Sequence, residues 1–140
     1  MRPALLFSVF VVASCGLAYE LIAASGPAKA TIFASGTETA IAVQARGLLE
    51  AEGVPTRVVS TPCWALFERQ KPAYQAAVIG QAPVRVAVEA GVRQGWERFI
   101  GPDGGFVGMS SFGASAPYQV LYEKFGITAE GVVAAVKSKL

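Results

Sequence analysis

The chain has 140 residues, with 12 lysines and arginines against 10 aspartates and glutamates, a hydrophobic fraction of 53% and no histidine. This length suits one domain with a single core, and the apolar fraction excludes an intrinsically disordered chain. The formal net charge of +2 gives no electrostatic basis for binding nucleic acid. Without histidine, a Ser-His-Asp or Cys-His relay, a histidine metal site and an imidazole base are excluded.

Residues 1–16 differ in character from the rest of the chain. Arg2 precedes an uncharged, largely apolar run over residues 3–14, which is too short to span a bilayer as a helix but is typical of a signal peptide. The small residues before Cys15 also match a bacterial lipobox, in which that cysteine would be lipidated. The alternative is an apolar lead-in, left where a longer coding frame was cut or shifted. Because so short a match is weakly specific, we favour the lead-in and do not expect membrane attachment.

From residue 30 onward, short apolar runs alternate with helical stretches. Residues 30–34 predict a buried strand. Ser35 and Glu38 have the spacing of a capping box, with Ser35 as the N-cap and Glu38 reaching back. The helix that follows is expected to end at Gly53, a residue that readily adopts the left-handed conformation. Its predicted apolar face consists of Ile41, Ala45, Leu48 and Leu49.

The alternation continues to the C-terminus. Further strands are predicted over residues 18–22, 56–60, 84–89 and 106–109. Helices are predicted around Trp64 and Phe67, over residues 72–78 and 92–99, from Ser115 and Pro117 to Gly126, and from Thr128 onward. Gly126 is expected to end the first of these last two helices, and Thr128 is expected to cap the second. The predicted apolar stripe of the last helix is Ala129, Val132, Val133, Val136 and Leu140.

Apolar strands separated by helices imply right-handed crossovers and a mostly parallel sheet that is covered on both faces. We therefore predict an α/β fold, a three-layer sandwich with a sheet of about five strands. Residues 18–22 are expected to form a further strand at the edge of the sheet. Residues 17–140 are expected to form a single domain with no internal linker.

Five segments, in their order along the chain, resemble the C-terminal domain of transketolase. They are ASGTE at 34–38, VVSTPCWALF at 58–67, VAVEAG at 86–91, FGASAP at 112–117 and LYEKFGIT at 121–128. The resemblance runs from about residue 17 to residue 140, and the last two segments are its most specific part. Residues 1–16 depart from the family pattern.

The resemblance implies an enzyme that uses thiamine diphosphate and Mg²⁺ to move a two-carbon ketol unit between sugar phosphates in the pentose phosphate pathway. Enzymes of this family have three α/β domains in each subunit and form homodimers in the cytoplasm. Their cofactor, metal and substrate residues lie in the first two domains. The resemblance also implies that the third domain, which this chain matches, has a mostly parallel five-stranded sheet with one antiparallel edge strand. That domain serves domain packing and the dimer contact. The resemblance thus implies that this chain holds no catalytic, cofactor or metal residue, and that its partners are the missing domains or a dimer mate.

A candidate anion site lies at Ser35, Gly36 and Thr37, between a predicted strand and the start of a helix. Open α/β sheets often bind anions at such positions. We favour a purely structural role as a helix cap, because the Glu38 carboxylate would occupy the free N–H groups and repel an anion.

Four further positions are interpreted as structural. Ser115 and Pro117 open a predicted helix, with the proline in its first turn. Cys63 precedes a short helix, where a thiol can be activated, but without histidine as a base we expect a packed small side chain. Glu89 ends an apolar strand, so its carboxylate needs a partner, and we expect an ion pair with Arg93 or Arg98.

Two functions of different classes remain open. The first is a C-terminal domain or fragment of a transketolase-like enzyme, which is non-catalytic by itself. The second is a stand-alone module that binds an anion or a protein and is anchored to a membrane through lipidated Cys15. Whether the chain itself belongs to an active enzyme depends on the catalytic domains, which the sequence does not contain.

Overall fold

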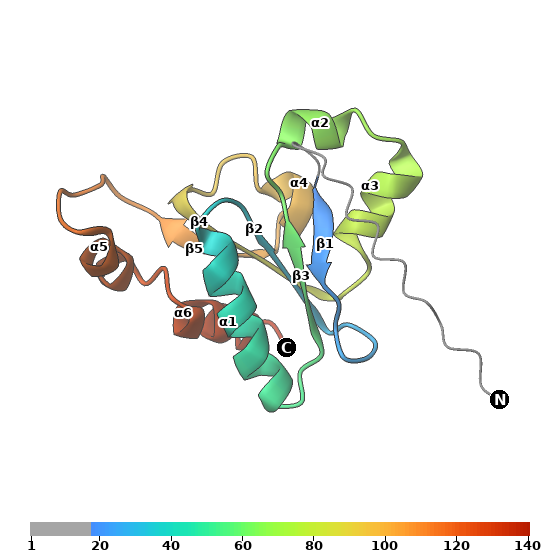
Figure 1. The fold of residues 1–140 in the computed structure, drawn as a ribbon, viewed down its shortest axis with the longest axis horizontal. Helices are drawn as coiled ribbons and strands as arrows, with labels where there is room; N and C mark the ends of the chain where they lie inside the picture. The colour runs from blue at the N-terminus through green and yellow to red at the C-terminus, as the bar shows by residue number, and fades with distance from the viewer. Residues whose placement is uncertain (1–17) are drawn as a thin grey trace.

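The computed structural model describes residues 18–140, so the lead-in and Cys15 lie outside the described residues. The sheet has five strands in the order β1-β3-β2-β4-β5 (Figure 1). The antiparallel pairing of β1 with β3 and the parallel pairing of the others confirm the predicted fold. The strands are β1 Tyr19–Ile22, β2 Ala30–Ala34, β3 Thr56–Ser60, β4 Val84–Val92 and β5 Gly105–Met109.

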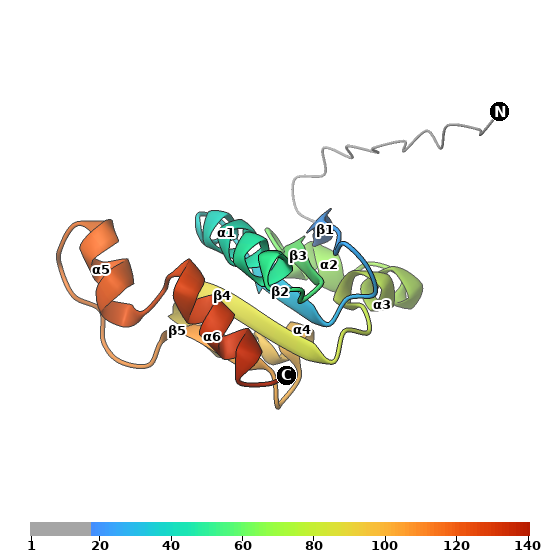
Figure 2. The same cartoon turned by 90° about the horizontal axis from the view of Figure 1, so that it is seen from below.

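Helices cover both faces of this sheet (Figures 1 and 2). One face packs against α1 (Glu38–Ala51) and α6 (Ala129–Lys137). The opposite face packs against α2 (Trp64–Glu68), α3 (Pro72–Ile79) and α4 (Glu97–Ile100), mainly through aromatic side chains. Within residues 18–140, no helix combines the length and the apolarity that crossing a membrane requires.

Most predicted elements are present, with three differences in extent. The helix predicted over residues 92–99 is wrong in its first half, because β4 continues to Val92 and α4 has only four residues. The face of α1 that packs on the sheet is shifted from the predicted stripe: it uses Ala42, Ala45 and Leu49, while Leu48 is 43% exposed. The small side chains of the two alanines let α1 approach the sheet closely. Leu140 lies beyond the end of α6 and is exposed.

Two helix boundaries follow the predicted chemistry. The hydroxyl of Thr128 accepts a hydrogen bond from the Gly131 N–H, so it caps α6 as expected. Gly126 has φ +68°, the left-handed conformation that ends α5 (Tyr118–Phe125). Pro117 precedes α5 at its N-cap position rather than inside its first turn.

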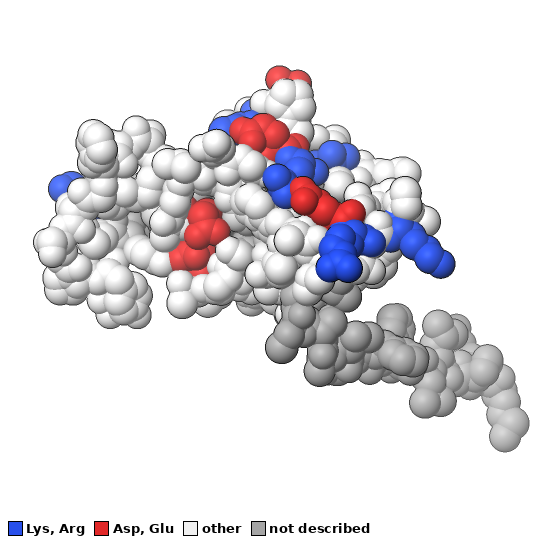
Figure 3. All heavy atoms as spheres, turned by 90° about the horizontal axis from the view of Figure 1, so that it is seen from above, with Lys and Arg blue, Asp and Glu red and all other residues white. Residues whose placement is uncertain are grey.

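The segment over residues 110–125, which we call the arm, projects from the sandwich and ends in α5 (Figures 1 and 2). Residues 110–120 are all exposed, and α5 has no buried residue. Phe112 is 98% exposed, and Tyr118 and Val120 are more than half exposed. Residues 110–122 contain no charged side chain, and Figure 3 shows an arm that is nearly uncharged beside a body with many charged groups. In soluble proteins, large exposed surfaces with few charges and with exposed aromatic side chains are typical of interaction sites.

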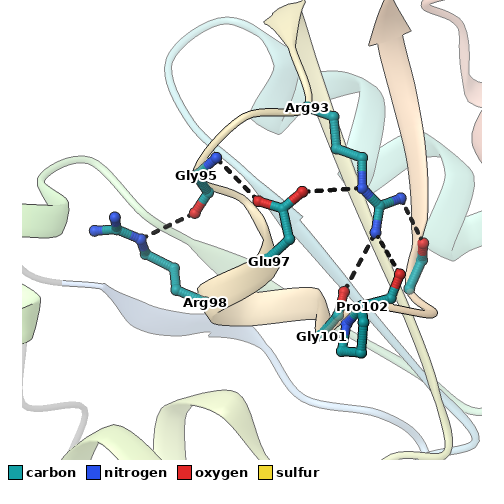
Figure 4. A network of polar contacts seen from close by, with 7 residues as sticks. Arg93, Gly95, Glu97, Arg98, Gly101 and Pro102 are labelled. Atoms are coloured by element: carbon teal, nitrogen blue, oxygen red, sulfur yellow. Dashed lines mark hydrogen bonds and ion pairs between the residues drawn. The ribbon is translucent and has the colours of Figure 1, made fainter.

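Arg93 ties the chain after β4 to the turn before β5 (Figure 4). Its guanidinium donates hydrogen bonds to the carbonyl oxygens of Gly101, Pro102 and Gly104 at 3.3, 2.9 and 2.8 Å. Its Nε also lies 3.1 Å from the Glu97 carboxylate. The planar guanidinium group of arginine can donate several hydrogen bonds at once. The Arg93 side chain therefore fixes the turn that precedes β5.

We predict that Arg93→Ala lowers the free energy of unfolding by about 1–2 kcal/mol, because three carbonyl groups lose their donor. Chemical denaturation followed by tryptophan fluorescence measures this change. The matched control is Arg69→Ala, at an exposed arginine after α2, with an expected change within about 0.5 kcal/mol. Equal stability of the two variants would contradict the role of Arg93.

Candidate functional site

The candidate anion site lies where β2 ends beside β4, with Ala34 of β2 paired with Val88 of β4. Because these strands are parallel, Ser35 after β2 and Glu89 near the end of β4 meet at the same edge of the sheet. The chain leaves β2 toward α1 on one face and leaves β4 toward α4 on the other. Such a divergence opens a crevice, which is the usual ligand position in open α/β sheets.

Five side chains form a polar cluster in this crevice, which we call the carboxyl cluster. The Ser35 hydroxyl donates to Glu89 Oε2 at 2.6 Å. The Thr37 hydroxyl donates to Glu38 Oε1 at 2.9 Å, and the Tyr122 hydroxyl, from α5, donates to the same oxygen. The Thr37 and Tyr122 oxygens are 3.3 Å apart. The cluster therefore joins α1, β4 and the arm.

No cation neutralises the two carboxyl groups of the cluster: within residues 18–140, no ion pair involves Glu38 or Glu89. Burial raises the pKa of Glu89 above its usual range, Ser35 opposes this by hydrogen bonding, and the neighbouring Glu38 raises it further. Burial also raises the pKa of Tyr122, as does its hydrogen bond to Glu38. Both shifts have the same main cause, the partial burial of a group that would otherwise ionise in water.

The predicted capping box at the start of α1 is wrong. Thr37 occupies the N-cap position, and no side chain caps the helix. The reason is a long-range contact, because the Ser35 hydroxyl is bound to Glu89, 54 residues away along the chain. Glu38 is the first helical residue and is only 4% exposed, with its carboxylate bound by Thr37 and Tyr122.

This arrangement is unfavourable for an anion. The Ser35 and Thr37 hydroxyls, which would bind it, are already bonded to carboxyl groups. The charge of Glu38 and Glu89 would repel it. The anion site at Ser35, Gly36 and Thr37 stays a prediction, and the structural role of this segment is the better supported of the two.

A groove of about 630 Å³ lies beside the carboxyl cluster, between α1 and α5. The rings of Tyr118 and Tyr122 form one wall, packed edge to face with centroids 5.7 Å apart. Among the residues that the structure describes, none with a charged side chain lines the groove. Its other lining residues are Gly36, Thr37, Ala40, Ile41 and Gln44. The groove therefore continues the uncharged surface of the arm into the body.

The expected ion pair of Glu89 with Arg93 or Arg98 is wrong. Arg93 points to the turn before β5, as described above. Arg98 pairs with Glu68 and lies over the Trp64 ring, 4.9 Å from its centroid. Both arginines are therefore engaged on the far side of the sheet from α1.

The remaining sequence candidates do not join the carboxyl cluster. Cys63 is a free, half-buried thiol before the five-residue α2, and its lack of reactivity stays a prediction. Ser115 and Pro117 lie in the exposed part of the arm, and no side chain caps α5. Within residues 18–140, no three cysteine or acidic side chains gather as metal ligands would.

Two residues of the arm were not predicted as functional from the sequence: Tyr122, which links the arm to the cluster, and Phe112, whose side chain is 98% exposed. The available signal was the absence of charged residues over residues 110–122. The contact of Tyr122 with Glu38 had no local signal, because it joins residues 84 positions apart.

Comparison with known proteins gives the family. Residues 18–128 match the model of the transketolase-like TK C-terminal domain. The chain is 55% identical over 118 residues to the transketolase of Sinorhizobium medicae, which covers 84% of this chain and 17% of that protein. It is 43% identical to transketolase 1 of Escherichia coli, with 87% and 19% covered.

Solved structures agree with this result. The transketolase of Leishmania mexicana superposes with a TM-score of 0.79 and 43% identity, over 87% of this chain and 18% of that one. A structure described as a split gene transketolase, inactive beta4 tetramer, gives a TM-score of 0.71 and 28% identity, over 91% and 43%. The chain thus spans less than a fifth of the full-length relatives named here. It belongs to the transketolase family and corresponds to the C-terminal domain of that enzyme.

Proposed function

We propose that this chain is the non-catalytic C-terminal domain of a transketolase assembly, and that it docks onto the catalytic domains and a dimer mate through the arm. The observation that carries this proposal is the exposed, uncharged arm, with Phe112 almost fully exposed. Such a surface is costly in water unless another protein covers it. The full-length relatives contain much more chain than the matched segment. This supports the catalytic domains as the partner that covers the arm.

The assembly would carry out the family reaction, the transfer of a two-carbon ketol unit between sugar phosphates. Thiamine diphosphate and Mg²⁺ would be held by the other domains, in keeping with the lack of histidine in this chain. The similarity to a split gene transketolase supports an assembly from separate chains. We place the assembly in the cytoplasm. An anchor through Cys15 is the less favoured alternative, and a diacylglyceryl group on Cys15, detected by mass spectrometry, would establish it.

The purified chain is predicted to bind no thiamine diphosphate and to catalyse no ketol transfer. Isothermal titration calorimetry with the cofactor and Mg²⁺ measures the first, and a coupled assay with sugar phosphates measures the second. The full-length transketolase of Sinorhizobium medicae serves as the positive control. Stoichiometric cofactor binding by the isolated chain would contradict the proposed division of labour.

Phe112→Ser is predicted to weaken docking by roughly tenfold or more, because burying a phenylalanine contributes about 1.5–3 kcal/mol. The partner is the Sinorhizobium medicae enzyme from which the matching C-terminal segment has been removed. Size-exclusion chromatography and biolayer interferometry measure the association. Leu140→Ser is the matched control, since Leu140 is also exposed but lies away from the arm. Equal affinity of both variants, or no association of the unmodified chain, would overturn docking through the arm.

A further inference from the structure

A second pocket, of about 340 Å³, lies near the start of β4, whereas the carboxyl cluster lies where β2 ends. Its walls come from residues 81–83, Arg85 of β4, the turn over residues 100–104, and Lys139, which follows α6. The volume is within the range of about 300–1,000 Å³ that is common for small-molecule sites. Two of the lining side chains, those of Arg85 and Lys139, are cationic.

Arg85 is a half-buried cation without a carboxylate partner. It is the second residue of β4, a strand inside the sheet, and its chain neighbours Val84 and Val86 are both buried. Its guanidinium donates a hydrogen bond to the Gly80 carbonyl oxygen at 3.2 Å, and within residues 18–140 it takes part in no ion pair. An arginine has five N–H donors, so most of them remain available. A charge that is partly removed from water in this way needs a counter-ion.

The arginine at the matching position of β3 has such a counter-ion. Arg57 and Arg85 lie on either side of Thr31 in β2, because Thr31 is the register partner of both. Arg57 is 8% exposed, and its Nε lies 2.7 Å from the carboxylate of Glu20. The chain therefore neutralises one of these two corresponding arginines with its own carboxylate, while the other lines the pocket.

Lys139 reaches the same pocket across the start of β5. Its Cε and Cδ lie 3.4 and 3.7 Å from the place that a Cβ atom on Gly105 would occupy, so the missing side chain of Gly105 leaves room for the lysine. In the described part of the chain Lys139 forms no ion pair, whereas Lys137, two residues earlier, pairs with Glu52. Two cations without carboxylate partners among residues 18–140 therefore line one pocket.

The turn over residues 101–104 adds little that would repel an anion. The carbonyl oxygens of Gly101, Pro102 and Gly104 accept hydrogen bonds from Arg93, which does not line the pocket. Among the described residues, Asp103 is the one acidic side chain of the lining, and it is exposed. The lining therefore carries more positive than negative charge.

From this arrangement we propose that the pocket binds a small molecule through an oxyanion, a phosphate or a carboxylate group, held by Arg85 and Lys139. A guanidinium can hold either group through two parallel hydrogen bonds, and the ammonium of Lys139 adds a second positive charge. The bound group supplies the counter-ion that Arg85 lacks within residues 18–140. The site uses residues of this chain alone, so it does not depend on docking through the arm.

Titration of the full 140-residue chain with sodium phosphate, followed in ¹⁵N NMR spectra near neutral pH and at constant ionic strength, tests the site. Saturable shifts are expected for backbone amides of residues 81–85 and 103–105, which surround the pocket. Arg85→Gln is expected to weaken binding by about tenfold or more, because it removes a charged hydrogen-bond donor. Lys139→Gln, at an exposed lysine, is expected to weaken it by about two- to fivefold.

Lys137→Gln is the matched control for Lys139→Gln. It changes the charge equally and lies two residues away, but Lys137 is paired with Glu52 and does not line the pocket. Its affinity for phosphate is expected to equal that of the unmodified chain. No saturable shift around the pocket with any anion tested, or equal affinity of the two lysine variants, would overturn the proposal.

Phosphate esters and carboxylic acids share the oxyanion, and a parallel titration with sodium acetate distinguishes them. Tighter binding of phosphate assigns the pocket to a phosphate ester, and tighter binding of acetate assigns it to a carboxylic acid; either result at these residues supports the site. Asp103→Asn covers the case in which Arg85→Gln does not fold, because Asp103 is exposed. It removes the negative charge of the lining and is expected to strengthen binding, and unchanged or weaker binding would contradict the proposal. None of these experiments involves a catalytic domain, so failure of this site is distinguishable from failure of docking.

Discussion

Burial of β2 on both faces is the constraint on which the rest of the structure depends. All five residues of this strand are fully buried, and a parallel sheet needs helices on both sides. α1 and α6 cover one face, and α2, α3 and α4 cover the other. Because both faces are occupied, α5 has no sheet surface to pack against. The exposed arm follows from a core that is complete without it.

The same parallel arrangement explains the carboxyl cluster. It brings the ends of β2 and β4 together while the chain departs to opposite faces, so the polar groups there must satisfy one another. Two of them are carboxyl groups, and neither forms an ion pair within the described part of the chain, residues 18–140. The arm contributes the Tyr122 hydroxyl to this cluster. The side chain of Tyr122 therefore connects the arm, which is the proposed docking surface, to the partly buried carboxyl groups of the cluster.

The strands and the order of the elements could be predicted from the sequence because continuous apolar runs such as residues 30–34 are local signals. The polar contacts of the cluster and of Arg93 could not be predicted from the sequence. Ser35 has the local pattern of a helix cap, yet its hydroxyl is taken by Glu89 from a neighbouring strand. Arg93 lies four residues after Glu89, but the backbone directs it to three carbonyl groups of a turn. Such choices depend on tertiary contacts that local spacing does not contain.

The most direct test of the central claim is a hydrogen-exchange footprint of this chain with and without the two-domain part of a transketolase relative. If the arm is the docking surface, exchange slows over residues 110–125 and the lining of the adjoining groove on α1, while α3, on the other face of the sheet, is unchanged. Slowed exchange over α3 with none over the arm would contradict the account.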